Sequence, residues 1–477
     1  MSDKKLIDFY ELTMAYSDFK NNRVNDIVYF DAFFRKNMDN NGYSIFGGLA
    51  EIIDYLNNVK FTKEDIEYLR SLNCFDEEFL EYLKTFKFTG DVYSFVDGDV
   101  VFPNETCIRV RAPLIEAEII ETDLLNKFNH ASLISTKASR IVNSAKGRAV
   151  MEFGARRAQG GDAASIGAKY ACIAGCIGTS CYESGKQYGV SILGTMAHSQ
   201  IMKYESEYDA FLDYAKTFPN NCTFLVDTID TINSGLKNAI RVHKEYLVPN
   251  GYRLKGIRLD SGDLSYLSKK CREILDANDM QDCKICASNS LDEYLIKDLL
   301  DQDAKIDSFG VGENLITSKS TPVFGGVYKL VAIEKDGEIS PRIKISDNEV
   351  KITNPGVKKV YRFYDNDTGF ALADLVALES ENIDLNEYEI FDEANTWKRK
   401  TLTNYTLKEM LQPIFINGKQ VYKVPSVNES KEYCQKQLNA LYPEIKRLFN
   451  PSKYYVDLSS ELYELKHSLI KEKRNSN

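Results

Sequence analysis

The sequence predicts an α/β fold, in which the middle of the chain forms a parallel sheet or barrel and both chain ends form a second, composite domain. In the middle, short apolar runs recur at about the thirty-residue spacing of a βα repeat, and most of them precede a helical pattern. Further on, apolar and polar residues alternate between turn signals, which is typical of antiparallel strands. No low-complexity linker divides these parts.

The elements can be predicted in chain order. Up to about residue 125 we expect an opening helix, a strand at 27–34 and helices through Leu83. The central strands are expected at 190–193, 223–226, 256–259, 285–287 and 306–309. Antiparallel strands are expected within 328–378, and an amphipathic helical end at 431–471. The predicted domains are therefore 1–125, 126–327 and 328–477, and the first and last are expected to pack together.

Polar residues or glycines follow each central strand. Because the carboxyl ends of parallel strands lie at one edge of a sheet, we expect these residues to converge on one site. Two helix starts fit this pattern, since Asp263 can cap a helix beginning at Leu264, and Ser290 with Glu293 forms a capping box. The converging residues are Thr195, His198, Asp227, Asp260, Asp263, Ser288, Asn289, Gly310 and Gly312.

Composition argues against several classes of function. The net charge is −10 with a pI near 5.3 and interspersed signs, which argues against a nucleic-acid partner. No apolar run is long enough to cross a membrane. A signal peptide needs an unbroken apolar segment near its start, and Asp8 and Glu11 interrupt that segment here. We therefore expect a cytoplasmic protein whose ten cysteines are reduced.

The segment 189–202, GVSILGTMAHSQIM, is the most informative stretch. It places one of only four histidines, His198, just after an apolar run and a Gly-Thr turn. Taken alone, a histidine in a first helical turn is as often a capping or surface residue as a functional one. The segments that accompany it favour a functional site.

Those segments resemble the nicotinate phosphoribosyltransferase family over nearly the whole chain. They include DFYELTMAY at 8–16, FDAFFRK at 30–36, EFGARRAQG at 152–160, LGTMAHS at 193–199, IRLDSGDL at 257–264, FGVGENL at 309–315 and GGVYKLVAI at 325–333. Any single segment is a weak signal, whereas all of them in this order are specific.

The resemblance implies a type II phosphoribosyltransferase fold, which is an irregular α/β barrel with a second α/β domain made from both chain ends. It implies a homodimer with shared active sites that couples nicotinate to phosphoribosyl pyrophosphate (PRPP) and releases pyrophosphate, in NAD salvage. The family uses ATP as a co-substrate through a phosphorylated histidine, which by position is His198. Mg²⁺ is expected as a cofactor carried by the pyrophosphate, with Asp260 as its one candidate protein ligand.

The residue types also suit this chemistry. Displacing pyrophosphate from ribose requires anion donors and carboxylates. Gly310 and Gly312 can present backbone N–H groups to a phosphate, although a plain tight turn would also explain them. Asp260 and Asp263 are candidates for ribose hydroxyls or magnesium waters, although Asp263 can simply cap its helix. The residues that could make further contacts with this phosphate are Ser288, Asn289, Gly325 and Gly326.

The substrate contacts follow mainly from the family pattern. A guanidinium can engage a carboxylate with two hydrogen bonds, and the pattern places Arg156 and Arg258 in the site. In the family the opening segment reaches the site, so Asp8 and Tyr10 carry over, with the tyrosine stacked on the pyridine ring. Thr195 is placed to hydrogen-bond nicotinate.

Two alternatives stay open. The first is the same reaction on nicotinamide, although relatives of that kind have a glutamate-containing sequence before the histidine, and here 195–198 reads Thr-Met-Ala-His. The second is a phosphate-binding protein without turnover. The joint presence of His198, Arg258, the two aspartates and the glycine loop argues against it.

Overall fold

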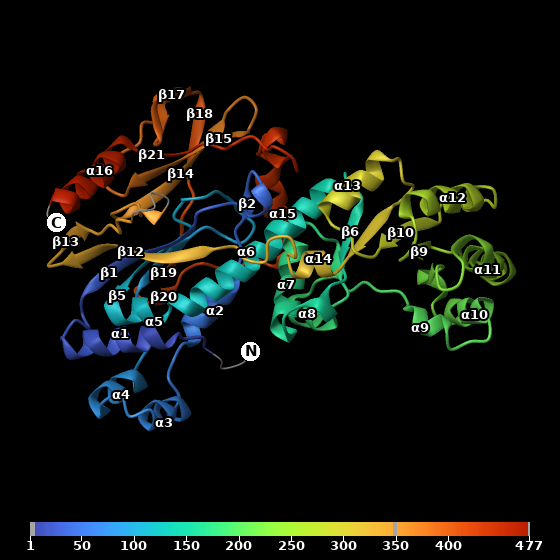
Figure 1. Ribbon diagram of the computed structural model, residues 1–477, viewed down its shortest axis with the longest axis horizontal. Helices are drawn as coiled ribbons and strands as arrows, with labels where there is room; N and C mark the ends of the chain where they lie inside the picture. The colour runs from blue at the N-terminus through green and yellow to red at the C-terminus, as the bar shows by residue number, and fades with distance from the viewer. Residues whose placement is uncertain (1–4, 347–350, 476–477) are drawn as a thin grey trace. The chain divides into compact units, whose positions relative to one another are not determined.

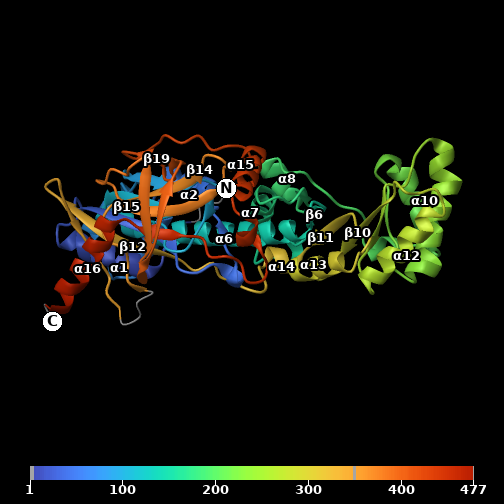
Figure 2. The same ribbon diagram turned by 90° about the horizontal axis from the view of Figure 1, so that it is seen from above.

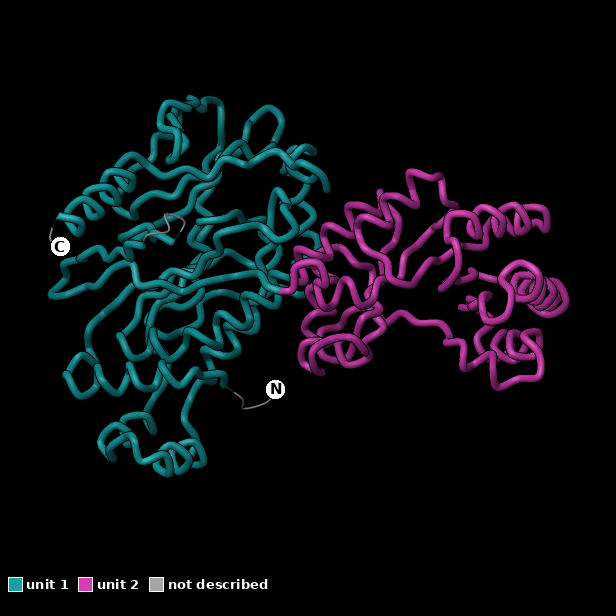
Figure 3. The backbone as a smooth tube through the Cα atoms, in the orientation of Figure 1, with its two compact units in different colours: residues 1–133, 323–477 teal, residues 134–322 magenta. Residues whose placement is uncertain are grey.

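The computed structural model describes residues 5–346 and 351–475, which form two compact units (Figure 1, Figure 3). Unit 1 comprises Met1–Leu133 and Val323–Asn477, and unit 2 comprises Ile134–Pro322. The sequence predicts the corresponding divisions near 125 and 327. The long helix α6 (Glu121–Ser144) runs through the first division.

Unit 2 is built on a six-stranded sheet in which every pairing is parallel. The strand order is β7-β6-β11-β10-β9-β8. Ile257, Ile285 and Phe309 are fully buried in it, as expected for strands covered on both faces. The predicted α/β class is therefore confirmed. The strands are β6 (Ala149–Glu152), β7 (Gly178–Thr179), β8 (Thr223–Leu225), β9 (Gly256–Leu259), β10 (Lys284–Ser288) and β11 (Ser308–Val311).

Helices of unit 2 lie on both sides of this sheet. Helix α7 packs against β6, and α12 packs against β9 and β10. Figure 1 and Figure 2 both show α7 and α8 beside β6, and Figure 1 shows α10 and α12 towards β9. The helices are α7 (Gly161–Ile173), α8 (Tyr182–Tyr188), α9 (His198–Ile201), α10 (Glu207–Thr217), α11 (Leu236–Val242), α12 (Leu264–Asp276), α13 (Glu293–Asp301) and α14 (Glu313–Ile316), with short helical turns η2 (Ala155–Arg157), η3 (Pro219–Asn221), η4 (Thr231–Gly235), η5 (His243–Leu247) and η6 (Val248–Asn250).

Closure of this sheet into a barrel stays a prediction. At the β7 edge, the described residues add only an isolated parallel bridge between Thr179 and Ile192. The prediction of a strand at 190–193 is therefore wrong beyond that one bridge. Ile192 is 51% exposed, so this run has too little covering structure to pair along its length.

The two predicted helix starts have different outcomes. Asp263 caps α12, since its Oδ1 accepts a hydrogen bond from the Tyr266 amide at 3.0 Å. The capping box at Ser290 is wrong, because Asp292 is the N-cap of α13 and accepts from the amides of Tyr294 and Leu295. Ser290 has φ of 51°, which is incompatible with the extended backbone of an N-cap.

Unit 1 contains the antiparallel strands that the sequence predicted. Its seven-stranded sheet has the order β13-β12-β1-β5-β3-β19-β20, and a four-stranded sheet has the order β18-β14-β15-β21. The strands are β1 (Ile27–Phe34), β2 (Ser44–Ile45), β3 (Asp91–Ser94), β4 (Val100–Val101), β5 (Ile108–Pro113), β12 (Gly326–Lys335), β13 (Glu338–Pro341), β14 (Lys358–Asp365), β15 (Ala371–Leu378), β16 (Glu387–Asp392), β17 (Asn395–Thr403), β18 (Tyr405–Glu409), β19 (Gln412–Ile416), β20 (Lys419–Gln420) and β21 (Val456–Leu458).

The core of unit 1 joins residues from both parts of the chain. Strand β1 pairs with β5 on one side and with β12 on the other, and α5 packs against β1 and β5. The helices are α1 (Phe9–Lys20), α2 (Leu49–Asn58), α3 (Lys63–Ser71), α4 (Glu77–Lys84), α5 (Leu114–Ile119), α15 (Val427–Asn439) and α16 (Ser460–Asn475), with 3₁₀ turns η1 (Met38–Asn40) and η8 (Pro443–Lys446). Within the described residues, no helix is long and apolar enough to span a bilayer.

A buried arginine also connects these parts. Arg362 is 1% exposed and donates to both oxygens of Asp374, at 2.8 and 2.6 Å. Its Nη2 also donates to the Val100 carbonyl at 2.9 Å, and Tyr454 OH donates to Asp374 Oδ1 at 2.8 Å. Burial, together with nearby Asp374, raises the pKa of Glu105 well above its usual value. The arginine is therefore the counter-charge of the buried Asp374 carboxylate, and through Val100 it also bonds the N-terminal part of the unit.

Candidate active site

The candidate site lies at the carboxyl edge of the parallel sheet in unit 2. Hydrogen bonds connect several segments here: the turns after β8 and β9, strands β9 and β10, and residues 195–198. The structure therefore brings together residues up to about a hundred positions apart, as the strand pattern predicted. The residues linked in this way are His198, Asp227, Arg258, Asp260, Ser261 and Ser288.

Asp227 connects the histidine to the turn after β9. Its Oδ1 lies 3.2 Å from His198 Nε2, and its Oδ2 accepts from the Asp260 amide and from Ser261 Oγ, both at 2.7 Å. The Asp227 side chain is 1% exposed, whereas that of His198 is 39% exposed. A buried carboxylate therefore orients an imidazole whose ring still reaches solvent. A proton on Nε2 donates to Asp227 and leaves the lone pair on Nδ1.

Arg258, Asp260 and Ser288 form a second connected group. Arg258 Nε donates to Ser288 Oγ at 2.8 Å, and its Nη2 donates to Asp260 Oδ1 at 3.0 Å. Ser288 Oγ in turn donates to the same carboxylate oxygen. Arg258 Nη1 also lies 3.4 Å from the Met196 carbonyl. Since a guanidinium has five N–H donors, Arg258 keeps donors for a ligand after making these contacts.

The glycine loop is partly explained by packing. Gly310 was expected in a turn, and that prediction is wrong, because Gly310 lies inside β11 between β10 and β6. A Cβ at Gly310 would lie 2.5 Å from the Phe153 ring, so close approach of this ring requires glycine. Gly312 follows the strand, and a Cβ there would lie 3.1 Å from the Phe153 carbonyl oxygen. Phosphate binding by either glycine stays a prediction.

The turn after β10 has an unusual backbone. Asn289 and Ser290 have φ of 90° and 51°, in the left-handed region that residues with side chains seldom adopt. Both residues are exposed, and Ser290 Oγ donates to Asn289 Oδ1 at 3.1 Å. Non-glycine residues held in this region are concentrated at functional sites, which fits the predicted phosphate contact of Asn289.

Three other predicted residues lie in unit 2 outside this hydrogen-bonded set. Asp263 caps α12, so one of its oxygens already has a partner. Thr195 is exposed and lines a cavity of about 570 Å³ that Met196 and Phe218 also line. Arg156 is exposed in the turn η2. Their assignment to the substrate stays a prediction.

The other predicted residues belong to unit 1. Tyr10 is 45% exposed on α1, and partial burial with nearby Glu121 raises its pKa to about 12. Asp8 is the N-cap residue of α1 but makes no side-chain cap. Gly325 has φ of +84°, and the Gly326 amide already donates to Asn129 Oδ1 at 2.7 Å. The Gly326 N–H is therefore engaged within its own unit.

The sequence pattern does not identify the carboxylate that supports the turn after β6. Glu152 is fully buried, and it accepts from the Gly154 amide and, at 2.6 Å, from Thr179 Oγ1. Burial raises the pKa of Glu152. It therefore fixes the turn that carries Phe153 and leads to Arg156. The only signal for it was its place in the EFGARRAQG segment, since strand 149–152 is too short to recognise by periodicity.

The arrangement combines an oriented imidazole, carboxylates, a guanidinium and a strained turn at the carboxyl edge of a parallel sheet. This is the edge at which open α/β sheets bind their ligands, and it defines the class as an α/β protein with a polar site at the carboxyl ends of its parallel strands.

Comparisons with known proteins define the family. Three family models match: the nicotinate phosphoribosyltransferase (NAPRTase) N-terminal domain at residues 6–129, the NAPRTase family at 148–386, and the NAPRTase C-terminal domain at 357–466. The nicotinate phosphoribosyltransferase of Bacillus subtilis is 43% identical over 98% of this chain and 94% of its own. That of Dictyostelium discoideum is 35% identical over 97% of this chain and 87% of its own. The chain belongs to the nicotinate phosphoribosyltransferase family, as the sequence segments indicated.

Solved structures agree with this fold. The crystal structure of human nicotinic acid phosphoribosyltransferase superposes with a TM-score of 0.86 at 27% identity, covering 97% of this chain and all of the human chain. A structure titled nicotinate-nucleotide pyrophosphorylase from Pyrococcus furiosus superposes with a TM-score of 0.70 at 22% identity, covering 91% and 94% of the two chains. The second likeness concerns the fold alone.

Proposed function

We propose that this protein transfers the phosphoribosyl group of PRPP to nicotinate in NAD salvage, and that it couples this reaction to ATP hydrolysis through a phosphohistidine at His198. The hydrogen bond between His198 Nε2 and buried Asp227, at the edge where Asp260, Arg258 and Ser288 also meet, carries the proposal. Similarity to nicotinate phosphoribosyltransferases over the whole chain supports the choice of substrates.

The ATP step uses the nitrogen that Asp227 leaves available. Nδ1 of His198 attacks the γ-phosphorus, a P–N bond forms, and ADP leaves with the electron pair of the broken P–O bond. Positive charge develops on the imidazole, and the Asp227 carboxylate stabilises it through the proton on Nε2. Water later hydrolyses the P–N bond and releases phosphate.

In the transfer step, the pyridine nitrogen of nicotinate forms a bond to the anomeric carbon of PRPP as the C–O bond to pyrophosphate breaks. Asp260 and Asp263 bind ribose hydroxyls, and Ser288, Asn289 and the loop at Gly312 bind phosphate oxygens. Arg258 and Arg156 bind the nicotinate carboxylate, and Thr195 hydrogen-bonds the same substrate.

Mg²⁺ fits these residues only as a substrate-borne ion. The described residues contain no group of three His, Cys, Asp or Glu side chains that could hold a metal by themselves. Mg²⁺ commonly binds through one or two carboxylates plus substrate phosphates and water, so Asp260 would hold it together with pyrophosphate. When bound, it would neutralise charge on the leaving group.

The proposed reaction is tested by base competition. The protein is supplied with PRPP, ATP and Mg²⁺ and equal amounts of nicotinate and nicotinamide, and nucleotide products and pyrophosphate are measured. We expect nicotinate mononucleotide and pyrophosphate in equal amounts, with little nicotinamide product. A preference for nicotinamide would establish the alternative in which the same reaction takes place on nicotinamide. PRPP binding without release of pyrophosphate would establish the non-catalytic alternative.

Replacing Arg258 should identify the charge it binds. Because a charge-assisted hydrogen bond is lost, we expect Arg258→Ala to weaken nicotinate use by about ten- to a hundredfold, and nicotinamide use far less. The measurement is kcat/KM for both bases. Arg253→Ala is the control, since Arg253 lies in the same unit and its contacts are an exposed ion pair with Asp282 and a hydrogen bond to the Asp279 carbonyl. Equal losses for both bases would assign Arg258 to the phosphate side, with Asp260 and Ser288.

The homodimer with shared sites is also part of the proposal. Exposed Tyr10 at the start of α1 is a suitable residue to enter the site of a partner. Tyr10→Ala and His198→Asn proteins, each deficient in nicotinate-stimulated ATP hydrolysis, are mixed under conditions of subunit exchange. About a quarter of the wild-type hydrolysis should return, because half of the dimers then have one intact site. A fully active monomer, or no recovery despite demonstrated exchange, contradicts shared sites.

A further inference from the structure

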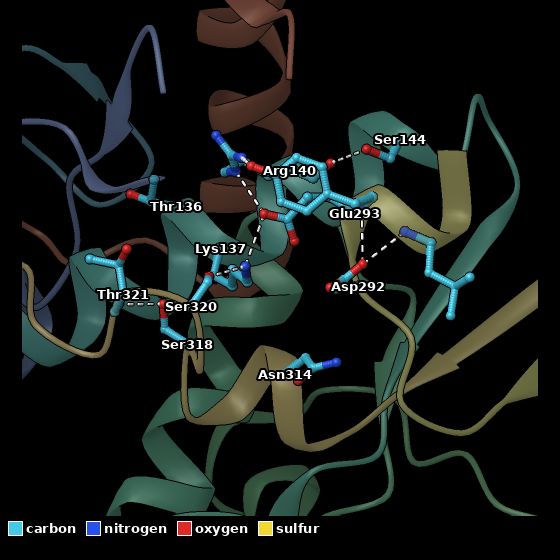
Figure 4. Close-up of polar contacts among 12 residues, drawn as sticks. Thr136, Lys137, Arg140, Ser144, Asp292, Glu293, Asn314, Ser318, Ser320 and Thr321 are labelled. Atoms are coloured by element: carbon cyan, nitrogen blue, oxygen red, sulfur yellow. Dashed lines mark hydrogen bonds and ion pairs between the residues drawn. The ribbon is translucent and has the colours of Figure 1, made fainter. Parts of the chain in front are cut away.

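The strained turn between β10 and α13 is fixed at both of its ends. At its start, Ser288 is bonded to Arg258 and Asp260. At its end, α13 begins with Glu293, which is fully buried and accepts at 2.9 Å from both Lys137 Nζ and Arg140 Nε. Figure 4 shows Glu293 between these two cations of α6, with Asn314 apart from them. The ends of the turn therefore have little freedom.

Between these anchors, the contact that reaches the strained residues comes from Asn314. This residue lies on α14, and its Nδ2 donates to the Ser290 carbonyl at 2.9 Å and to the Leu291 carbonyl at 3.2 Å. A left-handed conformation at Asn289 and Ser290 is unfavourable by itself and persists only where surrounding contacts require it. The Asn314 amide supplies two such contacts.

We infer that Asn314 is a positioning residue for PRPP: it holds the Asn289–Ser290 turn in the conformation that receives a phosphate group. The inference rests on the proposed function, which assigns Ser288 and Asn289 to phosphate. Asn314 acts through the carbonyls of Ser290 and Leu291, and the strained backbone aims N–H groups of the turn at an anion. In the proposed function nicotinate binds through Arg258, Arg156 and Thr195. Arg258 bonds Ser288 at the fixed start of the turn and not the strained residues Asn289 and Ser290, so loss of the Asn314 contacts should affect PRPP more than nicotinate.

Substitution of Asn314 tests this role. Asn314→Asp keeps the shape but removes the donor and places a carboxylate against two carbonyl oxygens. We expect the Kd for PRPP to rise about five- to thirtyfold, with the KM for nicotinate changed less than about twofold. Asn314→Ala, which adds no charge, should raise the Kd for PRPP about three- to tenfold. Hydrogen exchange of the 289–292 amides should become faster in both variants.

The control is Asn250→Asp, which removes a contact of the same kind. Asn250 Nδ2 donates to the Tyr246 carbonyl at 2.7 Å, and this variant should bind PRPP like the wild type. If both Asn314 variants bind PRPP as tightly as the wild type does, or if their affinities for PRPP and nicotinate fall equally, the positioning role is wrong. If the Asp variant does not fold, the Ala variant decides. Failure of the wild type to bind PRPP would instead refute the proposed function itself.

Discussion

His198→Asn should abolish nicotinate-stimulated ATP hydrolysis, lowering it by at least about a thousandfold, because the variant lacks the nitrogen that accepts the phosphoryl group. Slow PRPP-dependent synthesis of nicotinate mononucleotide should persist, since Asp260, Arg258 and Ser288 remain in place. The measurements are ADP formation and nucleotide formation in the same reaction mixture. Incubation with ATP labelled in the γ-phosphate should label the wild type and leave the variant unlabelled.

A second histidine provides the control for this experiment. His467 is exposed on α16 in unit 1, where its ring packs on Tyr463, and His467→Asn should keep full ATP coupling. The rate of nicotinate-stimulated ATP hydrolysis by Asp227→Asn should lie between the rates of the two histidine variants, since this change removes the charge that stabilises the imidazole but leaves His198 present. Full ATP coupling in His198→Asn would show that the phosphohistidine proposal is wrong.

Arg362→Met should lower the free energy of unfolding of unit 1 by about 3–5 kcal/mol, because removal of one partner leaves the buried Asp374 carboxylate without its counter-charge. Asp374 is fully buried, so water cannot replace the guanidinium. The loss also removes the contact with the Val100 carbonyl. The measurement is urea unfolding followed by circular dichroism, read at the transition that unit 1 contributes.

Arg362→Lys separates charge from geometry in this pair. Lysine keeps the positive charge but lacks the planar fork that bonds both oxygens of Asp374 in parallel, so a smaller loss than with methionine is expected. If the Arg362→Met protein is as stable as the wild type, the Arg362–Asp374 pair makes no net contribution to the free energy of unfolding. Replacement of Arg399, which pairs with Glu389 on the surface, should change stability by less than about 1 kcal/mol.

Much of the central sheet could be predicted because its strands are short apolar runs with clear ends. The run at 256–259 is observed with the predicted bounds, since Asp260 interrupts it. The strand expected at 306–309 is observed as Ser308–Val311, because glycine at 310 does not end a strand where Phe153 covers it. Strands β16 to β20 were not predicted, since β17 is exposed along most of its length and gives no alternating pattern.

The site could be predicted as a set of residues but not as a set of contacts. Strand order alone brings Asp227, Asp260 and Ser288 to one edge. That the Asp227 carboxylate would contact both His198 and the turn after β9 depends on side-chain rotamers and sub-ångström positions, which a sequence pattern does not contain. The same holds for Asn314, whose importance depends on the left-handed backbone of a turn 24 residues earlier.

Unit 1 is formed by two separate parts of the chain, and this affects how it folds during synthesis. Strand β1 needs β12 as a neighbour, and Tyr29 OH bonds Glu334, 305 residues further along the chain. Ribosomes add about 5–20 residues per second, so the 134–322 segment alone delays β12 by roughly 10–40 s. During that interval one edge of β1 lacks its strand partner and can pair with other nascent chains. Unit 2 is continuous and can complete its sheet first, so yield during expression should depend on chaperones that shield the waiting N-terminal strands.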